Sequence, residues 1–243
     1  MGNRRKGAIA LGVVLGVGAA DCVDASQHMA TCPSAAGAPK KCTGGTRMAD
    51  DGSIDDFEDG DTQLSKIGSR DGYWFIAKDP NGSTIAPSPL AMADQGADGS
   101  KKSLHVSGQT SSASGAWGSM VGVGLLSVNK VMYDASRYAG ISFKAKIGEG
   151  STKKIRFKIG DVNTHPDGGV CKDCWNHFGK DLPLTTSWQE FKITFAEMRQ
   201  EPGWGELKGA IDSSQLVSIN WSIGPGGLPF DLWIDDLQFF ECK

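Results

Sequence analysis

Apolar and polar residues alternate with a period of two along much of this chain. The alternation is clearest in four stretches: YAGISFKAKI (138–147), KKIRFKIGD (153–161), WQEFKITF (188–195) and LVSINWSI (216–223). In the first stretch Ile141 and Phe143 share one face, and Ser142 lies between them on the other. A strand with one buried face has this period, whereas a helix repeats every 3.6 residues. The four stretches therefore predict half-buried β-strands.

Further short strands are predicted at IDDFE (54–58), YWFIA (73–77), SLHVSGQ (103–109) and SMVGVGLL (119–126). Turns rich in Gly and Pro separate the strands, and no long stretch has helical spacing. About nine short strands of this kind indicate an antiparallel sandwich of two sheets. We predict an all-β fold with one core, because the 190 residues from Ile54 onward are enough to fill one.

The start of the chain, MGNRRKGAIALGVVLGVGAADC, is typical of an export signal. A basic segment ends at Lys6, and the 14 residues 7–20 form an apolar stretch too short to remain in a bilayer. We predict a signal peptide over 1–20, a low-complexity tether over 21–52 and a β-sandwich over 53–243. Lipid attachment at Cys22 stays an alternative, because Asp21 stands where a lipoprotein signal has Gly or Ala.

Charge and cysteine content agree with a protein of the cell surface or the extracellular medium. Removal of residues 1–20 leaves 22 basic against 28 acidic residues. This acidic balance argues against nucleic acid or an anionic membrane surface as a partner. Six cysteines in an exported chain predict disulfides. The pairing of four of them stays open: Cys22, Cys32, Cys42 and Cys242.

Two adjacent carboxylates interrupt the last strand, DLWIDDLQFF (231–240). Ile234 and Leu237 are three residues apart, so the alternation breaks and predicts a β-bulge at Asp235–Asp236. The first strand is acidic as well, in DDFEDGD, and first and last strands commonly pair in a sandwich. Carboxylates at close quarters repel unless a cation lies among them, and oxygen ligands suit calcium. The alternative is a solvated edge, where aspartates cost nothing.

Seven tryptophans fall into two groups. Trp188 and Trp221 lie in apolar strands and are predicted in the core, and Trp233 is undecided. The others lie among glycines and polar residues: Trp74, Trp117, Trp175 and Trp204. An exposed indole stacks well on the apolar face of a sugar, so these four are candidate ligand platforms, Trp117 first. The alternative is that each packs over its own loop.

The stretch DVNTHPDGGVCKDCWNHFG (161–179) combines a CxxC motif, Cys171 and Cys174, with His165 and His177. Three interpretations compete: a disulfide that stiffens a long loop, zinc held by two cysteines and two histidines, or a thioredoxin-like redox centre. The oxidising compartment favours the disulfide. Asp161 and Asn163 end the preceding strand and are candidates, with His177, for polar ligand contacts.

The order of these motifs resembles a known family. It runs IDDFEDGD, GSKKSLHVSG, YDASRYAGISFKAK, SWQEFKITF, GWG and FDLWIDDLQFF. Over residues 53–240 it is similar to the jelly-roll carbohydrate-binding modules of the galactose-binding-domain-like superfamily, family 11 above all. The resemblance implies a structural calcium at Glu58 and Asp236, with carbonyls near Gly60 and Lys102. It also implies a disulfide in the Cys171–Cys174 loop and a ligand site beside it.

No catalytic motif accompanies this resemblance. A glycosidase needs two carboxylates at a defined separation, and the acids here cluster at the predicted metal or scatter through loops. The sequence contains no GxSxG, HExxH or Gly-rich phosphate loop. We predict a non-catalytic monomer that binds a β-glucan-like plant or microbial polysaccharide. The alternatives are a secreted glycan hydrolase of unrecognised type and a structural surface module that binds protein.

Overall fold

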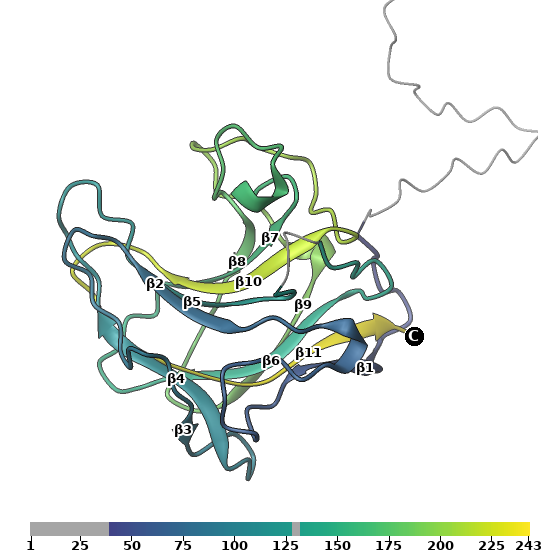
Figure 1. Ribbon diagram of the computed structural model, residues 1–243, viewed down its shortest axis with the longest axis horizontal. Coiled ribbons are helices and arrows are strands. Elements are labelled where there is room, and N and C mark those ends of the chain that lie inside the picture. Colours follow the sequence, from purple (N-terminus) through teal and green to yellow (C-terminus); the bar gives the residue numbers. More distant parts are fainter. Residues whose placement is uncertain (1–38, 128–131) are drawn as a thin grey trace, which may run out of the picture. The chain divides into compact units, whose positions relative to one another are not determined.

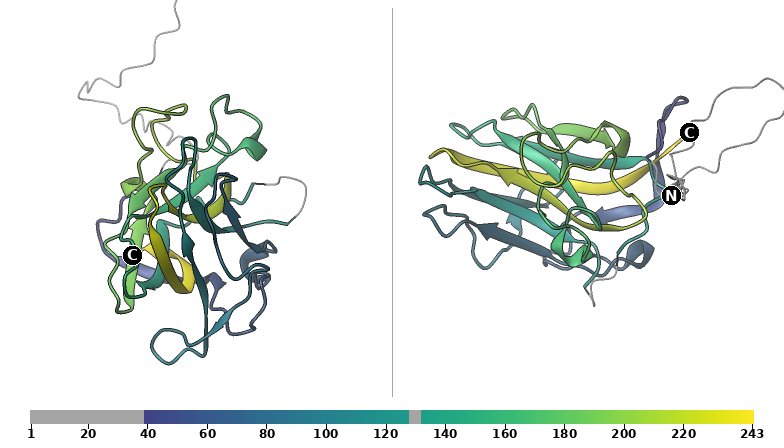
Figure 2. Two further views of the ribbon diagram at one scale, coloured as in Figure 1. Left: turned by 90° about the vertical axis from the view of Figure 1, so that its left-hand side faces the viewer. Right: turned by 90° about the horizontal axis from the view of Figure 1, so that it is seen from above.

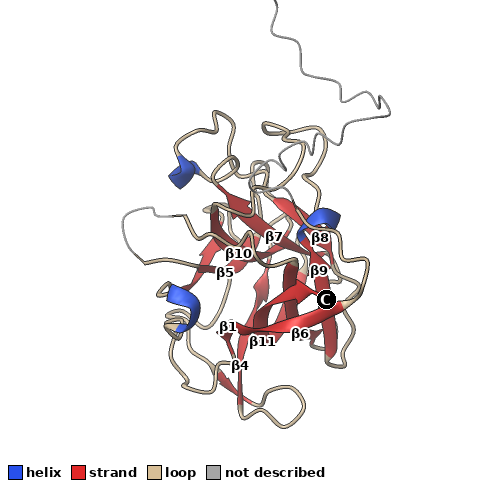
Figure 3. Ribbon diagram, turned by 90° about the vertical axis from the view of Figure 1, so that its right-hand side faces the viewer, coloured by secondary structure: helices blue, strands red, loops and turns tan. Residues whose placement is uncertain are grey.

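The chain folds into two antiparallel β-sheets packed face to face (Figure 1). The computed structural model describes residues 39–127 and 132–243, so the predicted signal peptide and Cys22 lie outside the described residues. Three short 3-10 helices lie outside the sheets (Figure 3): η1 (Ile67–Ser69), η2 (Pro166–Gly168) and η3 (Phe195–Glu197). No helix in these ranges is long and apolar enough to cross a membrane. The predicted all-β sandwich is confirmed.

One sheet has the strand order β3-β4-β11-β6-β9, with β1 also paired to β11. Its strands are β1 (Thr46–Asp55), β3 (Ala93–Asp94), β4 (Lys102–Gln109), β6 (Gly140–Ile147), β9 (Gln189–Thr194) and β11 (Pro229–Cys242). We call it the six-stranded sheet. The connecting loops gather at the two ends of the sandwich (Figure 2).

The other sheet has the order β2-β5-β10-β7-β8 and is called the five-stranded sheet. Its strands are β2 (Trp74–Lys78), β5 (Ser119–Gly124), β7 (Ile155–Asp161), β8 (Phe178–Asp181) and β10 (Leu216–Ile223). The four stretches with the clearest alternation form β6, β7, β9 and β10. Their inward side chains meet between the sheets, where Trp221 lies edge-on to Phe143 and Phe157 at 5.1 and 5.3 Å.

The predicted bulge in the last strand is present. The pairing of β11 with β6 shifts register between Asp235 and Gln238, and Asp236 has a φ of 51°. At this point the second neighbour of β11 changes. It is β4 along Pro229–Ile234 and β1 along Leu237–Cys242. The extra residue of the bulge allows the strand to bend where it changes partner.

The two aspartates of the bulge are neutralised by different groups. The Asp235 carboxylate is fully buried and accepts hydrogen bonds from the N–H groups of Ala97 (2.7 Å) and Asp236 (2.8 Å). Asp236 instead pairs with Lys144, whose Nζ lies 2.7 Å from Asp236 Oδ2 and 2.7 Å from Asp98 Oδ2. Backbone N–H groups thus compensate the charge of Asp235, and the Lys144 ammonium group compensates that of Asp236.

The ordered sheet begins within the stretch predicted as a tether. Strand β1 starts at Thr46, opposite Cys242, and a disulfide joins Cys42 to Cys242. The strand lacks apolar alternation, and no side chain fits at Gly52, where a Cβ atom would lie 2.4 Å from the Phe239 carbonyl oxygen. Backbone pairing with β11, the disulfide, and the buried side chains of Ala49 and Ile54 hold β1 in place.

Trp188 does not lie in the core, contrary to the prediction. It precedes β9 and is half-buried on the outer side of the six-stranded sheet, with Lys146 Nζ 5.0 Å from its ring centroid. The alternation that begins at Phe191 does not extend back to Trp188, because the chain is not yet paired there.

Loss of the Cys42–Cys242 disulfide should destabilise the fold strongly. It links residues 200 positions apart, and a cross-link over a long loop restricts the unfolded chain most. We expect Cys42→Ser with Cys242→Ser to lower the free energy of unfolding by about 2–5 kcal/mol in urea titrations. The control is Cys171→Ser with Cys174→Ser, whose short loop should cost less. Equal effects would contradict this.

Candidate functional site

The outer face of the five-stranded sheet carries small and polar residues at its centre. In β10, Ile219 and Trp221 point into the core, so the residues between and beside them face outward. The outward positions around the centre of β5, β10 and β7 are Gly122, Gly124, Ser218, Asn220, Lys158 and Gly160. Glycine within a strand often marks a place where another group approaches the backbone closely.

Asn220 lies at the centre of this face with an unused acceptor. Its Nδ2 donates to Ser218 Oγ (3.0 Å), whereas its buried Oδ1 has no hydrogen-bond partner among the described residues. Gly122 makes room for this side chain, because a Cβ atom there would lie 2.2 Å from Oδ1. A buried acceptor without a partner costs about 1–3 kcal/mol. Asn220 is 2% exposed, so this acceptor lies beneath the surface of the face.

An exposed indole and an ion pair lie next to Asn220. Lys158 is directly opposite Asn220 on β7, and its Nζ is 3.0 Å from Glu201 Oε2. The same Nζ lies 5.9 Å from the ring centroid of Trp204, which is 43% exposed. An open aromatic face beside charged donors and acceptors matches the apolar and hydroxyl faces of a sugar.

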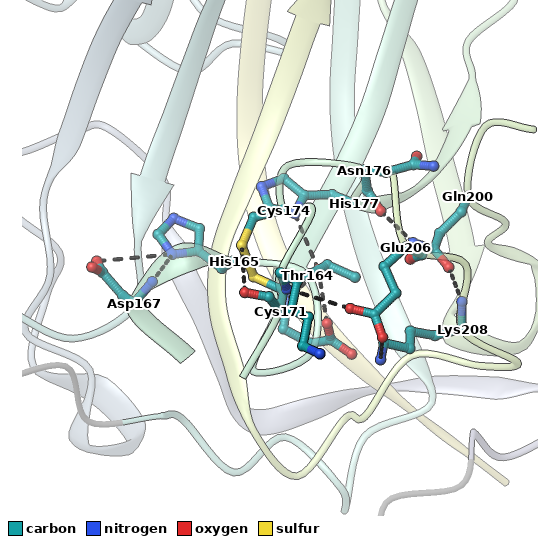
Figure 4. The surroundings of a disulfide bond; sticks show 12 residues. Thr164, His165, Asp167, Cys171, Cys174, Asn176, His177, Gln200, Glu206 and Lys208 are labelled. Carbon is teal, nitrogen blue, oxygen red and sulfur yellow. Dashed lines mark hydrogen bonds and ion pairs between the residues drawn. A yellow bond between two sulfur atoms is a disulfide. The ribbon is translucent and has the colours of Figure 1, made fainter. Parts of the chain in front are cut away.

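The Cys171–Cys174 disulfide is present, which confirms the first of the three interpretations of the CxxC loop (Figure 4). The loops that follow β7 and β9 rise above the β7–β8 edge of the five-stranded sheet (Figure 1). Trp175 in the first loop is 52% exposed and has a φ of 78°. A left-handed backbone costs a bulky residue about 1–3 kcal/mol, and such strain concentrates at functional sites.

Asp161 and His177 are buried, which corrects their prediction as ligand contacts. Asp161 accepts hydrogen bonds from Thr164 Oγ1 (2.8 Å) and the Asp212 N–H (2.8 Å), and Asn163 also bonds to it. His177 is 5% exposed because its ring lies over Gly160, which has no side chain. Asp161 and His177 form the base of the loop, whereas Asn163 is half-buried and stays a candidate, as does the exposed Trp175.

Trp74 is buried, so its prediction as a ligand platform is wrong. It is 3% exposed, its Nε1 donates to Asp55 Oδ2 (2.7 Å), and its ring packs on Phe57 and Trp221. The polar sequence around it misled the prediction, because Tyr73 is the residue that faces outward there, with 55% exposure.

Trp117 remains a candidate, at the other end of the same sheet. It is 46% exposed, and the next residue, Gly118, donates its N–H to the buried carboxylate of Asp79 (2.7 Å). β5 pairs with β10 from Ser119 to Gly124, and that length corresponds to about 17 Å. Trp117 therefore lies far from the Trp175 and Trp204 loops, along the strand direction.

The predicted metal ligands are brought together in part. Ser100 Oγ donates to both Glu58 Oε1 and the Lys102 carbonyl, at 2.8 Å each, and Gly60 lies against the Lys102 side chain. The Asp236 carboxylate is held by Lys144 instead. Within residues 39–127 and 132–243, no three His, Cys, Asp or Glu side chains form a metal-binding group.

Sequence reasoning missed the centre of the face. Asn220, Lys158 and Glu201 are unremarkable in the sequence, because polar residues at alternate positions simply predict an outer face. The available signal was the pair of glycines at alternate outward positions of β5, in SMVGVG (119–124). It indicates a strand face kept free of side chains.

No family model and no curated protein matches this sequence. Among solved structures, the family 11 carbohydrate-binding module of the cellulase Lic26A-Cel5E of Clostridium thermocellum is similar. It is 18% identical, over 80% of this chain and 94% of that chain, with a TM-score of 0.52. A family 11 module from the same organism, in complex with a β-1,3-1,4-mixed-linked tetrasaccharide, is also similar. It is 17% identical, over 75% of this chain and 96% of that chain, with a TM-score of 0.52. The chain therefore has the jelly-roll fold of these modules, as its motifs predicted.

Burial of His177 should make the fold sensitive to acid. Burial lowers the pKa of His177 to about 3, below the value of about 6.5 in an unfolded chain. The unfolded state therefore takes up a proton first, and stability falls as pH drops below about 6.5. At pH 5 this contribution is about 2 kcal/mol. Urea titrations at pH 7 and 5 should show a smaller pH effect in His177→Gln, and an unchanged pH effect would contradict the assignment.

Proposed function

We propose that this protein binds polysaccharide, without catalysis, on the outer face of the five-stranded sheet. The observation that carries the proposal is the exposed ring of Trp204 beside the Lys158–Glu201 ion pair. A sugar offers an apolar C–H face for the indole and hydroxyl groups for the polar atoms. The shared fold with carbohydrate-binding modules supports the same ligand class.

The proposed ligand is an extended, β-glucan-like chain. Trp117 at one end of the face and Trp175 and Trp204 at the other are separated by about the length of β5, roughly 17 Å. A polymer that runs along the strands contacts both groups, whereas a single sugar contacts one. The family 11 neighbour that was solved with a mixed-linked tetrasaccharide makes a β-glucan the first ligand to test.

The carboxylates favour binding over hydrolysis. A glycosidase needs two carboxyl groups at the substrate, one of them with a raised pKa. On the proposed face Glu201 is held in an ion pair with Lys158. The acids whose pKa is raised by burial are Asp55, Asp161 and Asp235, and all three are buried away from solvent.

The proposed location is outside the cytoplasm, secreted or on the cell surface. Two disulfides, Cys42–Cys242 and Cys171–Cys174, agree with an oxidising compartment. A monomer is proposed, with polysaccharide as its partner.

Replacement of the exposed tryptophans should separate binding from stability. We expect Trp204→Ala and Trp175→Ala each to weaken β-glucan binding about tenfold to hundredfold, since a stacked ring contributes on the order of 1–3 kcal/mol in the analogous stacking on nucleobases. Their melting temperatures should stay near that of the wild type. Isothermal calorimetry with β-glucan oligosaccharides measures the first effect and calorimetric melting the second.

Trp74→Phe is the matched control, because Trp74 is buried and should affect stability alone. Trp117→Ala tests whether the ligand spans the sheet, with a loss expected only for long oligosaccharides. Full affinity in the Trp175, Trp204 and Trp117 variants would overturn the proposed surface. Absence of binding to any glycan on a broad array, or release of reducing sugar, would overturn the function.

We further propose a structural calcium ion at the loop around Ser100. Three oxygen atoms that suit calcium lie together there: Glu58 Oε1, Ser100 Oγ and the Lys102 carbonyl. The proposed set includes the Gly60 carbonyl, which the resemblance implies, and Asp235 in place of Asp236, which is engaged by Lys144. Burial raises the pKa of Asp235, whose carboxylate lies beside Ser100, so a cation there would stabilise this carboxylate.

A chelator should then lower the melting temperature, because a saturating ligand of the folded state stabilises it by roughly 3–4 kcal/mol. Asp235→Asn should remove the calcium-dependent part of the shift. Asp236→Asn is the control and should retain it, since that residue contacts Lys144. Identical melting curves with calcium and with chelator would rule the ion out.

A further inference from the structure

The loop that carries Trp204 is anchored by one buried side chain, that of Asn176. Asn176 is 1% exposed, and its Nδ2 donates to the carbonyls of Glu201 (2.8 Å) and Trp204 (2.7 Å). Its Oδ1 accepts from the Glu201 N–H (3.0 Å). The amide therefore satisfies three backbone groups of a loop that has no strand partner between residues 200 and 210.

Further hydrogen bonds around Asn176 join the Cys171–Cys174 loop to the loop that carries Trp204. Gln200 Nε2 donates to the Asn176 carbonyl (2.6 Å) and to the Glu206 carbonyl (2.9 Å), and the Glu206 N–H donates to the Asp173 carbonyl (3.1 Å). In Figure 4 Asn176, Gln200 and Glu206 lie together, beside the Cys171–Cys174 loop. Gly205 allows this approach, because its φ is 66° and a Cβ atom there would lie 2.6 Å from that of Asn176.

The sheet beneath holds the start of this loop, where Arg199 pairs with Gly179 of β8 and its carbonyl accepts from Arg156 Nη2 (2.6 Å). The ion pair between Lys158 and Glu201 ties the loop to β7, and Glu201 is 39% exposed in its side chain. Partly exposed ion pairs contribute little to stability. Beyond Arg199, the position of Trp204 above Lys158 therefore depends on the neighbouring loop, through Asn176, more than on that ion pair.

We propose that Asn176 is a positioning residue for the ligand. It holds Trp204 and Glu201 at the height and angle at which they present a stacking face and a polar group next to Asn220. It does not itself contact ligand, because its side chain is buried. The effect of Asn176 on ligand binding rests on the proposed function. The anchoring of the loop rests only on the hydrogen bonds of Asn176.

A double-mutant cycle tests the positioning role. We expect Asn176→Ala to weaken β-glucan binding about tenfold, and Trp204→Ala to weaken it at least as much. Because Asn176 acts through Trp204 and Glu201, the double variant loses less affinity than the sum of the two single losses. Additive losses would overturn the proposal, as would full affinity in Asn176→Ala. Should Asn176→Ala fail to fold, Asn176→Asp replaces it, because the carboxylate keeps the acceptor and removes both donors.

Hydrogen exchange supplies a readout that does not depend on the ligand. In Asn176→Ala the amides of residues 200–206 should exchange faster, while those of β10 keep their wild-type rates. Faster exchange with no glycan binding by the wild type would reject the proposed function and keep the anchoring role. Unchanged exchange in residues 200–206 would reject the anchoring role itself.

Discussion

The structure depends on the point where β11 changes partners. This strand pairs with β6 along most of its length and exchanges β4 for β1 at the bulge of Asp235 and Asp236. A buried carboxylate is tolerated there because Asp235 accepts two backbone N–H groups, one of them from Ala97. That bond also holds the loop at Ala97 against the last strand. The bulge thus joins both halves of the six-stranded sheet and the proposed calcium loop.

The two outer faces of the sandwich use their aromatic residues differently. On the six-stranded sheet, His105 stacks on Trp233 at 3.8 Å, and Lys146 lies 4.9 Å from Trp233 and 5.0 Å from Trp188. These groups cover one another's faces and stabilise the sheet across strands. On the five-stranded sheet the centre is small or polar, and the exposed rings are carried by surrounding loops. That difference places the proposed ligand on the second face.

The proposed surface carries several local costs. Trp175 has a left-handed backbone, Asn220 has an unused acceptor, and the uncharged burial of His177 costs stability below about pH 6.5. Each lowers stability by an amount that the rest of the fold must offset. Such local costs concentrate at functional sites. The well-packed core around Trp221 and the long-range disulfide at Cys242 supply that reserve.

The sequence by itself determined the sandwich, the strands β6, β7, β9 and β10 and the bulge at Asp235, and it favoured the Cys171–Cys174 disulfide over zinc or a redox centre. These are local features, since a period of two, or a spacing of two residues between cysteines, is decided by neighbours along the chain. Only the tertiary structure decided that Trp74 is core and Trp204 exposed, although both stand beside glycines or polar residues. Exposure depends on which distant segments cover a side chain: β1 residues bury Trp74 through Asp55, whereas Asn176 holds the Trp204 loop out over the sheet.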